Sequence, residues 1–188
     1  MKLWKLFYML ISVFNSIEPH AEGSEGFLMM TKTEKTVAKC PPVDLGGEEG
    51  WTPFDAPSLV GASLRFVSGE PDGNRYRVRY YKTAEQELRA RIWFGPETEG
   101  PPDHSHGGAM AAVMDEVLGL AAWAAGYSIV VGNLNVSFRN LLPLEKVVTV
   151  ESKVVSAEGR KVMVHGQLCD GDTVFVEAEC LCITIPQK

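Results

Sequence analysis

Two adjacent carboxylates lie in an otherwise uncharged stretch of this chain. Asp115 and Glu116 are the only formally charged residues between Asp103 and Arg139, and most of their neighbours are apolar. A carboxylate among apolar residues is costly unless it is paired, hydrogen-bonded or open to a cleft, so it is a candidate nucleophile or general base. Adjacent helix positions face about 100° apart. We therefore expect Asp115 to be the functional carboxylate and Glu116 to point to solvent.

A pair of glycines precedes the carboxylates. Gly107 and Gly108 follow a proline-containing loop and stand where an apolar helix is expected to begin. The first turn of a helix leaves N–H groups without intrahelical partners and carries the positive end of the helix dipole, so it can bind a developing oxyanion. The alternative is that the glycines only allow close packing or an unusual backbone angle. Their position at the helix start favours the oxyanion role.

The spacing of the two groups has a consequence for assembly. Gly107 and Asp115 are eight positions apart, which is roughly 12 Å along one helix. A carbonyl oxygen and the nucleophile that attacks its carbon must each lie within about 3 Å of their protein partners. We therefore expect two copies of the helix to lie antiparallel in a homodimer, with the glycines of one subunit facing the aspartate of the other.

The elements that position these residues are one helix and a series of strands. The helix is expected from Gly107 to about Ala125, and its apolar residues on nearly every side indicate burial all round. Alternating or apolar runs predict strands at about 63–67, 76–81, 88–94, 129–141, 147–156, 161–169 and 173–185. Glycine turns between the last strands make them antiparallel neighbours. One buried helix wrapped by a long antiparallel sheet predicts an α+β chain with the hotdog fold.

The residues before this domain differ in composition. Residues 1–30 contain a short apolar run after two lysines, which has the shape of a targeting signal but is too short to span a bilayer. The alternative is an extension ahead of an internal start near Met29-Met30. Residues 31–61 are rich in proline, glycine and acidic residues and are expected to be a linker arm. The hotdog domain is then expected at residues 62–185, with no stable membrane span.

Composition argues against several function classes. With 18 basic and 24 acidic residues and a net charge of −6, the chain lacks the concentrated positive surface that nucleic acid requires. The sequence Asp103-His104-Ser105-His106 has no third spaced ligand, so no metal is expected. The four cysteines form no CxxC pair, and Cys180 and Cys182 are expected as small buried thiols on one side of a strand. A Ser-His-Asp hydrolase is disfavoured because no Gly-x-Ser-x-Gly elbow occurs.

The combined motif resembles a known family. His106-Gly107-Gly108, Asp115, Gly119 and the later Asn133-Leu134-Asn135 are similar to the pattern of PaaI-type hotdog thioesterases. The runs Glu99-Gly100-Pro101-Pro102 and Glu158-Gly159-Arg160-Lys161 bring the chain closer to the branch called thioesterase superfamily members, whose animal representatives hydrolyse long-chain acyl-CoA. The resemblance covers about residues 62–185.

The resemblance implies an activity and roles for individual residues. Asp115 would act as nucleophile or general base, and a backbone N–H at Gly107 or Gly108 would polarise the thioester carbonyl of the partner's substrate, without metal or cofactor. His106, Asn133 and Arg139 are candidate substrate-binding residues: His106 anchors the loop, and Arg139 could meet CoA phosphates. The expected assembly is a homodimer or a dimer of dimers, and the expected location is intracellular, either cytoplasmic or organellar, because CoA esters occur there.

One position departs from the family. Relatives often carry Ser or Thr two residues before the Asn-Leu-Asn motif, where the hydroxyl helps to hold the water; here that position is Val131. Ser128 or Asn133 could substitute for it. Val131 therefore keeps open the alternative of a non-catalytic acyl-CoA binding or regulatory hotdog protein. A hotdog dehydratase is disfavoured because the loop and helix offer no Asp and His pair placed for β-hydroxyacyl chemistry.

Overall fold

The structure, a computed structural model, describes residues 38–56 and 65–186. The expected targeting segment at residues 1–30 lies outside these residues, and so does part of the expected arm. Among the residues that are described, no helix is long and apolar enough to cross a membrane.

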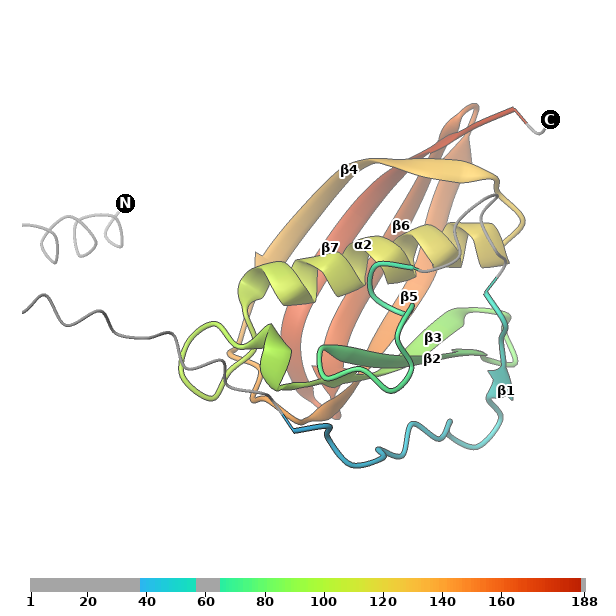
Figure 1. Cartoon of the computed structure of the whole chain (residues 1–188). Coiled ribbons are helices and arrows are strands. Elements are labelled where there is room, and N and C mark those ends of the chain that lie inside the picture. Colours follow the sequence, from blue (N-terminus) through green and yellow to red (C-terminus); the bar gives the residue numbers. More distant parts are fainter. Residues whose placement is uncertain (1–37, 57–64, 187–188) are drawn as a thin grey trace, which may run out of the picture. The chain divides into compact units, whose positions relative to one another are not determined.

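Seven strands form one antiparallel sheet in the order β1-β2-β3-β5-β6-β7-β4 (Figure 1). They are β1 (Thr52–Pro53), β2 (Tyr76–Lys82), β3 (Leu88–Phe94), β4 (Ile129–Phe138), β5 (Val147–Glu158), β6 (Lys161–Asp170) and β7 (Thr173–Thr184). The chain leaves the sheet after β3 through a short 3-10 helix, η1 (Pro96–Thr98), and the helix α2 (Gly107–Ala124). It returns at the far edge as β4, which pairs with β7. Among residues 38–56 and 65–186, β4 has no second neighbour, so one of its edges is free of described strands.

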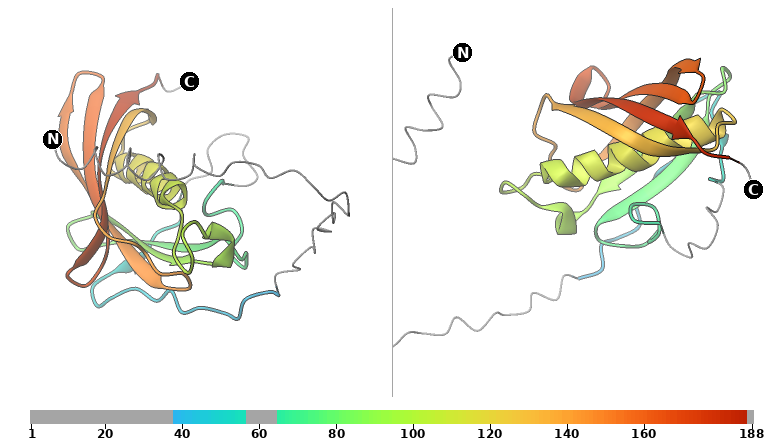
Figure 2. Two further views of the ribbon diagram at one scale, coloured as in Figure 1. Left: turned by 90° about the vertical axis from the view of Figure 1, so that its left-hand side faces the viewer. Right: turned by 90° about the horizontal axis from the view of Figure 1, so that it is seen from above.

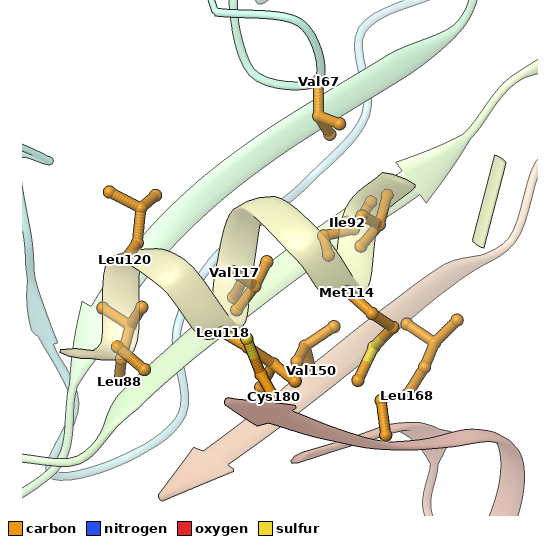
Figure 3. Packing of buried hydrophobic residues seen from close by; sticks show 14 of the residues in the cluster. Val67, Leu88, Ile92, Met114, Val117, Leu118, Leu120, Val150, Leu168 and Cys180 are labelled. Atoms are coloured by element: carbon orange, nitrogen blue, oxygen red, sulfur yellow. The ribbon is translucent and has the colours of Figure 1, made fainter. Parts of the chain in front are cut away.

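The sheet curls around α2, as the end-on view shows (Figure 2). Met114, Val117 and Leu118 point from α2 into a core that also contains Val150 and Leu168 (Figure 3). Burial of such apolar side chains is the main free-energy gain of folding, about 25 cal/mol per Å² of apolar surface removed from water. The packing confirms the predicted α+β arrangement of one central helix against a long antiparallel sheet.

A glycine lets α2 approach the sheet closely. A Cβ added at Gly166 on β6 would lie 2.5 Å from Cδ2 of Leu118 and 2.8 Å from the carbonyl oxygen of Glu151. No side chain fits there without a shift of the helix or of β5. The position thus fixes the distance between α2, which carries the candidate site, and the sheet.

We expect Gly166→Ala to lower the free energy of unfolding by roughly 1–3 kcal/mol, the range for overpacking a core. Urea denaturation followed by circular dichroism measures the change. In a Leu118→Ala background the cost of Gly166→Ala should be smaller, because one of the two clashing groups is gone. Equal stability of Gly166→Ala and wild type would show that the helix can move at no cost.

Three sequence-based expectations were wrong in detail. Residues 65–67 of the first expected strand form no strand, and 66–67 lie in a turn, whereas residues 63–64 lie outside the described residues. The strand β4 ends at Phe138 rather than near residue 141. The helix is not buried all round, because Gly108 and Asp115 are exposed in the single chain. Apolar periodicity alone could not distinguish a helix enclosed by its own chain from one with an exposed face.

The described part of the arm packs on the sheet. The guanidinium of Arg77 donates to the carbonyl oxygens of Pro41 and Cys40, the latter at 2.9 Å. The Tyr81 hydroxyl donates to the carbonyl oxygen of Leu45 at 2.6 Å, and β1 pairs with the end of β2. In the part that the structure describes, the arm is therefore held in place, although the sequence indicated only a linker.

Candidate functional site

The histidine before the two glycines caps α2. His106 has extended backbone angles (φ −64°, ψ 139°), and its Nδ1 accepts a hydrogen bond from the Gly108 N–H at 2.9 Å. Its carbonyl oxygen accepts from Ala109 and Met110 at 2.9 and 3.2 Å. Its own N–H donates to the carbonyl oxygen of Thr98 at 2.7 Å, which ties the cap to η1. His106 therefore organises the first turn of the helix.

The His106 cap binds the backbone N–H of one glycine and leaves that of the other available. The N–H of Gly108 is occupied by His106, whereas the N–H of Gly107 has no acceptor among the described residues. Gly107 is half-buried, and a Cβ there would lie 3.4 Å from the ring of Phe138. Of the two predicted oxyanion donors, Gly107 has the available N–H, directed outward from the positive end of α2.

We expect His106→Ala to destabilise the protein by about 1 kcal/mol, because the Gly108 N–H loses its acceptor at the N-cap. His106→Asn should retain most of this stability, since asparagine is a strong N-cap residue. Thermal unfolding of the three proteins measures the difference. If His106→Ala unfolds at the wild-type temperature, the ring does not stabilise the helix start.

The aspartate lies in the middle of α2 and is exposed in the single chain. Its carboxylate makes no hydrogen bond or ion pair with any described residue. The pKa of Asp115 is raised above its usual value. Partial desolvation by the surrounding protein is the larger cause, and the negative charge of Glu116 is the smaller one. A carboxylate that is open, unpartnered and more basic than usual is suited to accept a proton or to attack an electrophile.

Glu116 does not point to solvent, and that expectation was wrong. It is half-buried and accepts hydrogen bonds from the Tyr80 hydroxyl at 2.7 Å and from the N–H groups of Val67 and Ser68 at 3.0 and 3.2 Å. The 100° offset between neighbouring positions separated the two carboxylates as expected. It could not show which side was covered, because segment 65–70, which covers Glu116, lies 48 and 49 residues away in the chain at its contacting residues Ser68 and Val67.

The remaining predicted residues lie on or beside β4. Val131 packs against α2: a Cβ at Gly119 would be 3.5 Å from its Cγ2. Leu134 and Val136 pack against the core, so Asn133 lies on the opposite face, where it is exposed. Arg139 is also exposed and forms an ion pair with Glu177, with Nη2 to Oε2 at 2.6 Å. Within one chain, neither Asn133 nor Arg139 is brought together with Asp115.

Two thiols lie on β7 beneath the helix. Cys180 and Cys182 are fully buried, and their sulfurs are 3.5 Å apart. This confirms their expected placement as buried thiols on one side of a strand. Both lie within electrostatic range of Asp115.

The match to a protein family covers the part of the chain that carries these groups. The family model of the thioesterase superfamily matches residues 103–180. These residues are therefore similar to the thioesterase superfamily. The matched region contains the helix start, Asp115, the strands β4, β5 and β6 and the first part of β7.

Similar curated proteins match a larger part of the chain. The acyl-coenzyme A thioesterase THEM4 of Xenopus laevis is 34% identical over 106 residues, which cover 56% of this chain and 48% of the relative. The acyl-coenzyme A thioesterase THEM5 of Homo sapiens is 31% identical over 118 residues, which cover 61% of this chain and 47% of the relative. The chain thus spans about half the length of the curated relatives it matches.

Solved structures confirm the hotdog fold of this chain. The crystal structure of a thioesterase superfamily protein has a TM-score of 0.55 and 29% identity, and the match covers 57% of this chain and 53% of that one. A hypothetical thioesterase from Streptococcus pneumoniae TIGR4, crystallised with coenzyme A, has a TM-score of 0.53 and 13% identity. That second match covers 61% of this chain and 91% of the other; at its level of identity it bears on the fold alone.

Proposed function

We propose that the protein is an acyl-CoA thioesterase that hydrolyses a fatty acyl-CoA to the free acid and CoA. The observation that carries this proposal is the presence, on one helix, of an unpartnered N–H at Gly107 and an unpartnered carboxylate at Asp115. A donor for an oxyanion and a base or nucleophile are the two groups that thioester hydrolysis requires. The names of the relatives supply the substrate class.

The reaction needs only the protein's own groups. The thioester carbonyl oxygen accepts a hydrogen bond from Gly107 N–H, which stabilises the negative charge that develops there. Asp115 either removes a proton from the water that attacks the carbonyl carbon or attacks that carbon itself, in which case water later cleaves the acyl-aspartyl anhydride. The new C–O bond replaces the C–S bond, and CoA leaves as the thiolate and takes up a proton.

The active site is composite and lies across a homodimer. Gly107 and Asp115 are roughly 12 Å apart along α2 and therefore serve different substrates. The face of α2 that bears Gly108 and Asp115 is open in the single chain. Beside it, β4 has a free edge, and Phe138 and Leu141 are 52% and 60% exposed. A second copy covering these apolar groups would bring its own Asp115 towards Gly107, and the same surfaces permit a dimer of dimers.

A specific observation also favours a second candidate, a non-catalytic acyl-CoA binding protein. Val131 packs against Gly119, one helical turn from Asp115, and has no hydroxyl to hold a water. A protein that binds acyl-CoA without cleaving it would keep the fold and the dimer but lack turnover. The two candidates share an intracellular location, since CoA esters occur there.

A panel of acyl-CoA esters of increasing chain length, with detection of the released thiol, tests the proposal. We expect turnover with fatty acyl-CoA and no effect of chelators. Saturable binding of acyl-CoA without release of thiol would favour the second candidate. Neither binding nor turnover across the panel would contradict both.

A further inference from the structure

The proposed reaction gives no role to Glu116, the second carboxylate of α2, or to the hydrogen bonds around it, which we call the clamp. Three donors surround this carboxylate: the Tyr80 hydroxyl and the N–H groups of Val67 and Ser68. Burial, followed by the charge of Glu116, raises the pKa of Tyr80, so that its hydroxyl stays protonated and remains a donor. Charge-assisted hydrogen bonds of this kind are about twice as strong as neutral ones. The clamp therefore holds segment 65–70 on the helix.

The clamped segment forms a wall of a pocket of about 410 Å³. The pocket is lined by both apolar and charged side chains: Arg65, Phe66, Val67, Glu70, Arg75 and Tyr76. Tyr76 reaches α2, because its hydroxyl donates to the carbonyl oxygen of Ala109 at 3.4 Å. The pocket thus lies beside α2, and Val67 belongs to both the pocket and the clamp.

We propose that Glu116 is a positioning residue for thioester hydrolysis: it holds segment 65–70 as a wall of the pocket that receives the acyl-CoA, and its charge acts on Asp115. This inference rests on the proposed function, because it assigns the pocket to the substrate of the same site. Glu116 itself does not touch the reacting atoms. It acts through Val67 and Ser68 on binding and through Asp115 on proton transfer.

The charge of Glu116 acts on Asp115 in a definite direction. Loss of solvent is the larger cause of the raised pKa of Asp115, and the Glu116 carboxylate is the second. The charge of Asp115 also acts on the buried thiols of Cys180 and Cys182 on β7. Tyr80 interacts with Glu116 and also with the charge of Arg65. Since Asp115 must be ionised to act as base or nucleophile, activity falls as the pH drops through its raised pKa, and removing the Glu116 charge should move this acid limb to lower pH.

Two substitutions separate the effect of Glu116 on substrate binding from its effect on the pKa of Asp115. Glu116→Gln removes the charge and replaces one acceptor oxygen by a donor, so we expect KM to rise roughly fivefold, as for the loss of about one hydrogen bond. The acid limb of kcat should move down by roughly half a pH unit. Tyr80→Phe removes one donor but keeps the charge, so KM should rise without a shift of the acid limb. Glu158→Gln, at the exposed β5–β6 hairpin, is the matched control and should change neither.

Two readouts do not depend on turnover. Carboxyl NMR titration should show a lower midpoint for Asp115 in Glu116→Gln than in wild type, and amide exchange at Val67 and Ser68 should become faster. If Glu116→Gln loses only thermal stability and keeps the wild-type KM, acid limb and Asp115 midpoint, the residue is merely structural and the inference is wrong. A wild-type protein that hydrolyses none of the acyl-CoA panel contradicts the proposed function and the catalytic role with it, whereas titration and exchange still decide whether the clamp and the charge effect exist.

Discussion

Asp115→Asn is expected to lower turnover by roughly 100-fold or more while the protein keeps its fold. Asparagine preserves the shape of the side chain but cannot take a proton from water or attack a thioester as an anion. Because Asp115 makes no hydrogen bond or ion pair with a described residue, its replacement removes no internal contact and should not reduce stability. Steady-state release of thiol from acyl-CoA, together with thermal unfolding, measures both effects.

The neighbouring carboxylate supplies the control for this prediction. Glu116→Gln changes charge by the same amount one position further along α2, yet we expect a much smaller loss of turnover, since Glu116 acts only through its neighbours. Wild-type turnover of Asp115→Asn would remove Asp115 from the mechanism. A larger loss for Glu116→Gln than for Asp115→Asn would assign the chemistry to the other carboxylate.

Gly107→Pro should abolish activity in the homodimer. Activity should return when a Gly107→Pro subunit pairs with an Asp115→Asn subunit in a mixed dimer. Gly107 is the first residue of α2, and the preceding His106 has φ −64° and ψ 139°, which is the conformation that a following proline requires. Proline is favoured at this helix position because the N–H it removes has no intrahelical partner. The substitution therefore deletes the proposed oxyanion donor and leaves the helix intact. Gly107→Ala, which keeps the N–H, is the matched control and should remain active.

In the mixed dimer, one composite site carries both substitutions and the other carries neither. After complete subunit exchange we expect each heterodimer to recover about half of the wild-type turnover, if the two sites act independently. Differently tagged subunits allow heterodimers to be isolated by sequential affinity purification before the assay. Heterodimers with no more activity than their parents would exclude a site shared between subunits.

Much of the site could be predicted from the sequence because the signals are local. The helix start at Gly107 follows from two glycines after a proline-containing loop, and the structure places α2 there. Asp115 was identified because a charge in an apolar run is costly wherever the run folds. The turns at Gly159 and Gly171 have positive φ values of 56° and 55°, which glycine adopts readily, so the antiparallel pairing of β5, β6 and β7 was also predictable.

The surroundings of these residues depend on contacts between distant segments, and only the tertiary structure decided them. The hydrogen bonds to Glu116 come from segment 65–70 and from β2, 36 to 49 residues away in the chain. No periodic pattern encodes such pairing. The sequence therefore could not show that Glu116 is held and that Asp115 is open.

Which of the two glycines has an available backbone N–H was likewise decided by the tertiary structure. In the sequence, Gly107 and Gly108 are equivalent candidates, and His106 is one of several polar residues near them. The backbone angles of His106 direct its ring to the Gly108 N–H, which leaves the Gly107 N–H available. Residue types and spacing determined which groups are present on α2, whereas packing of the loop, segment 65–70 and β4 around the helix determined which of those groups are free to react.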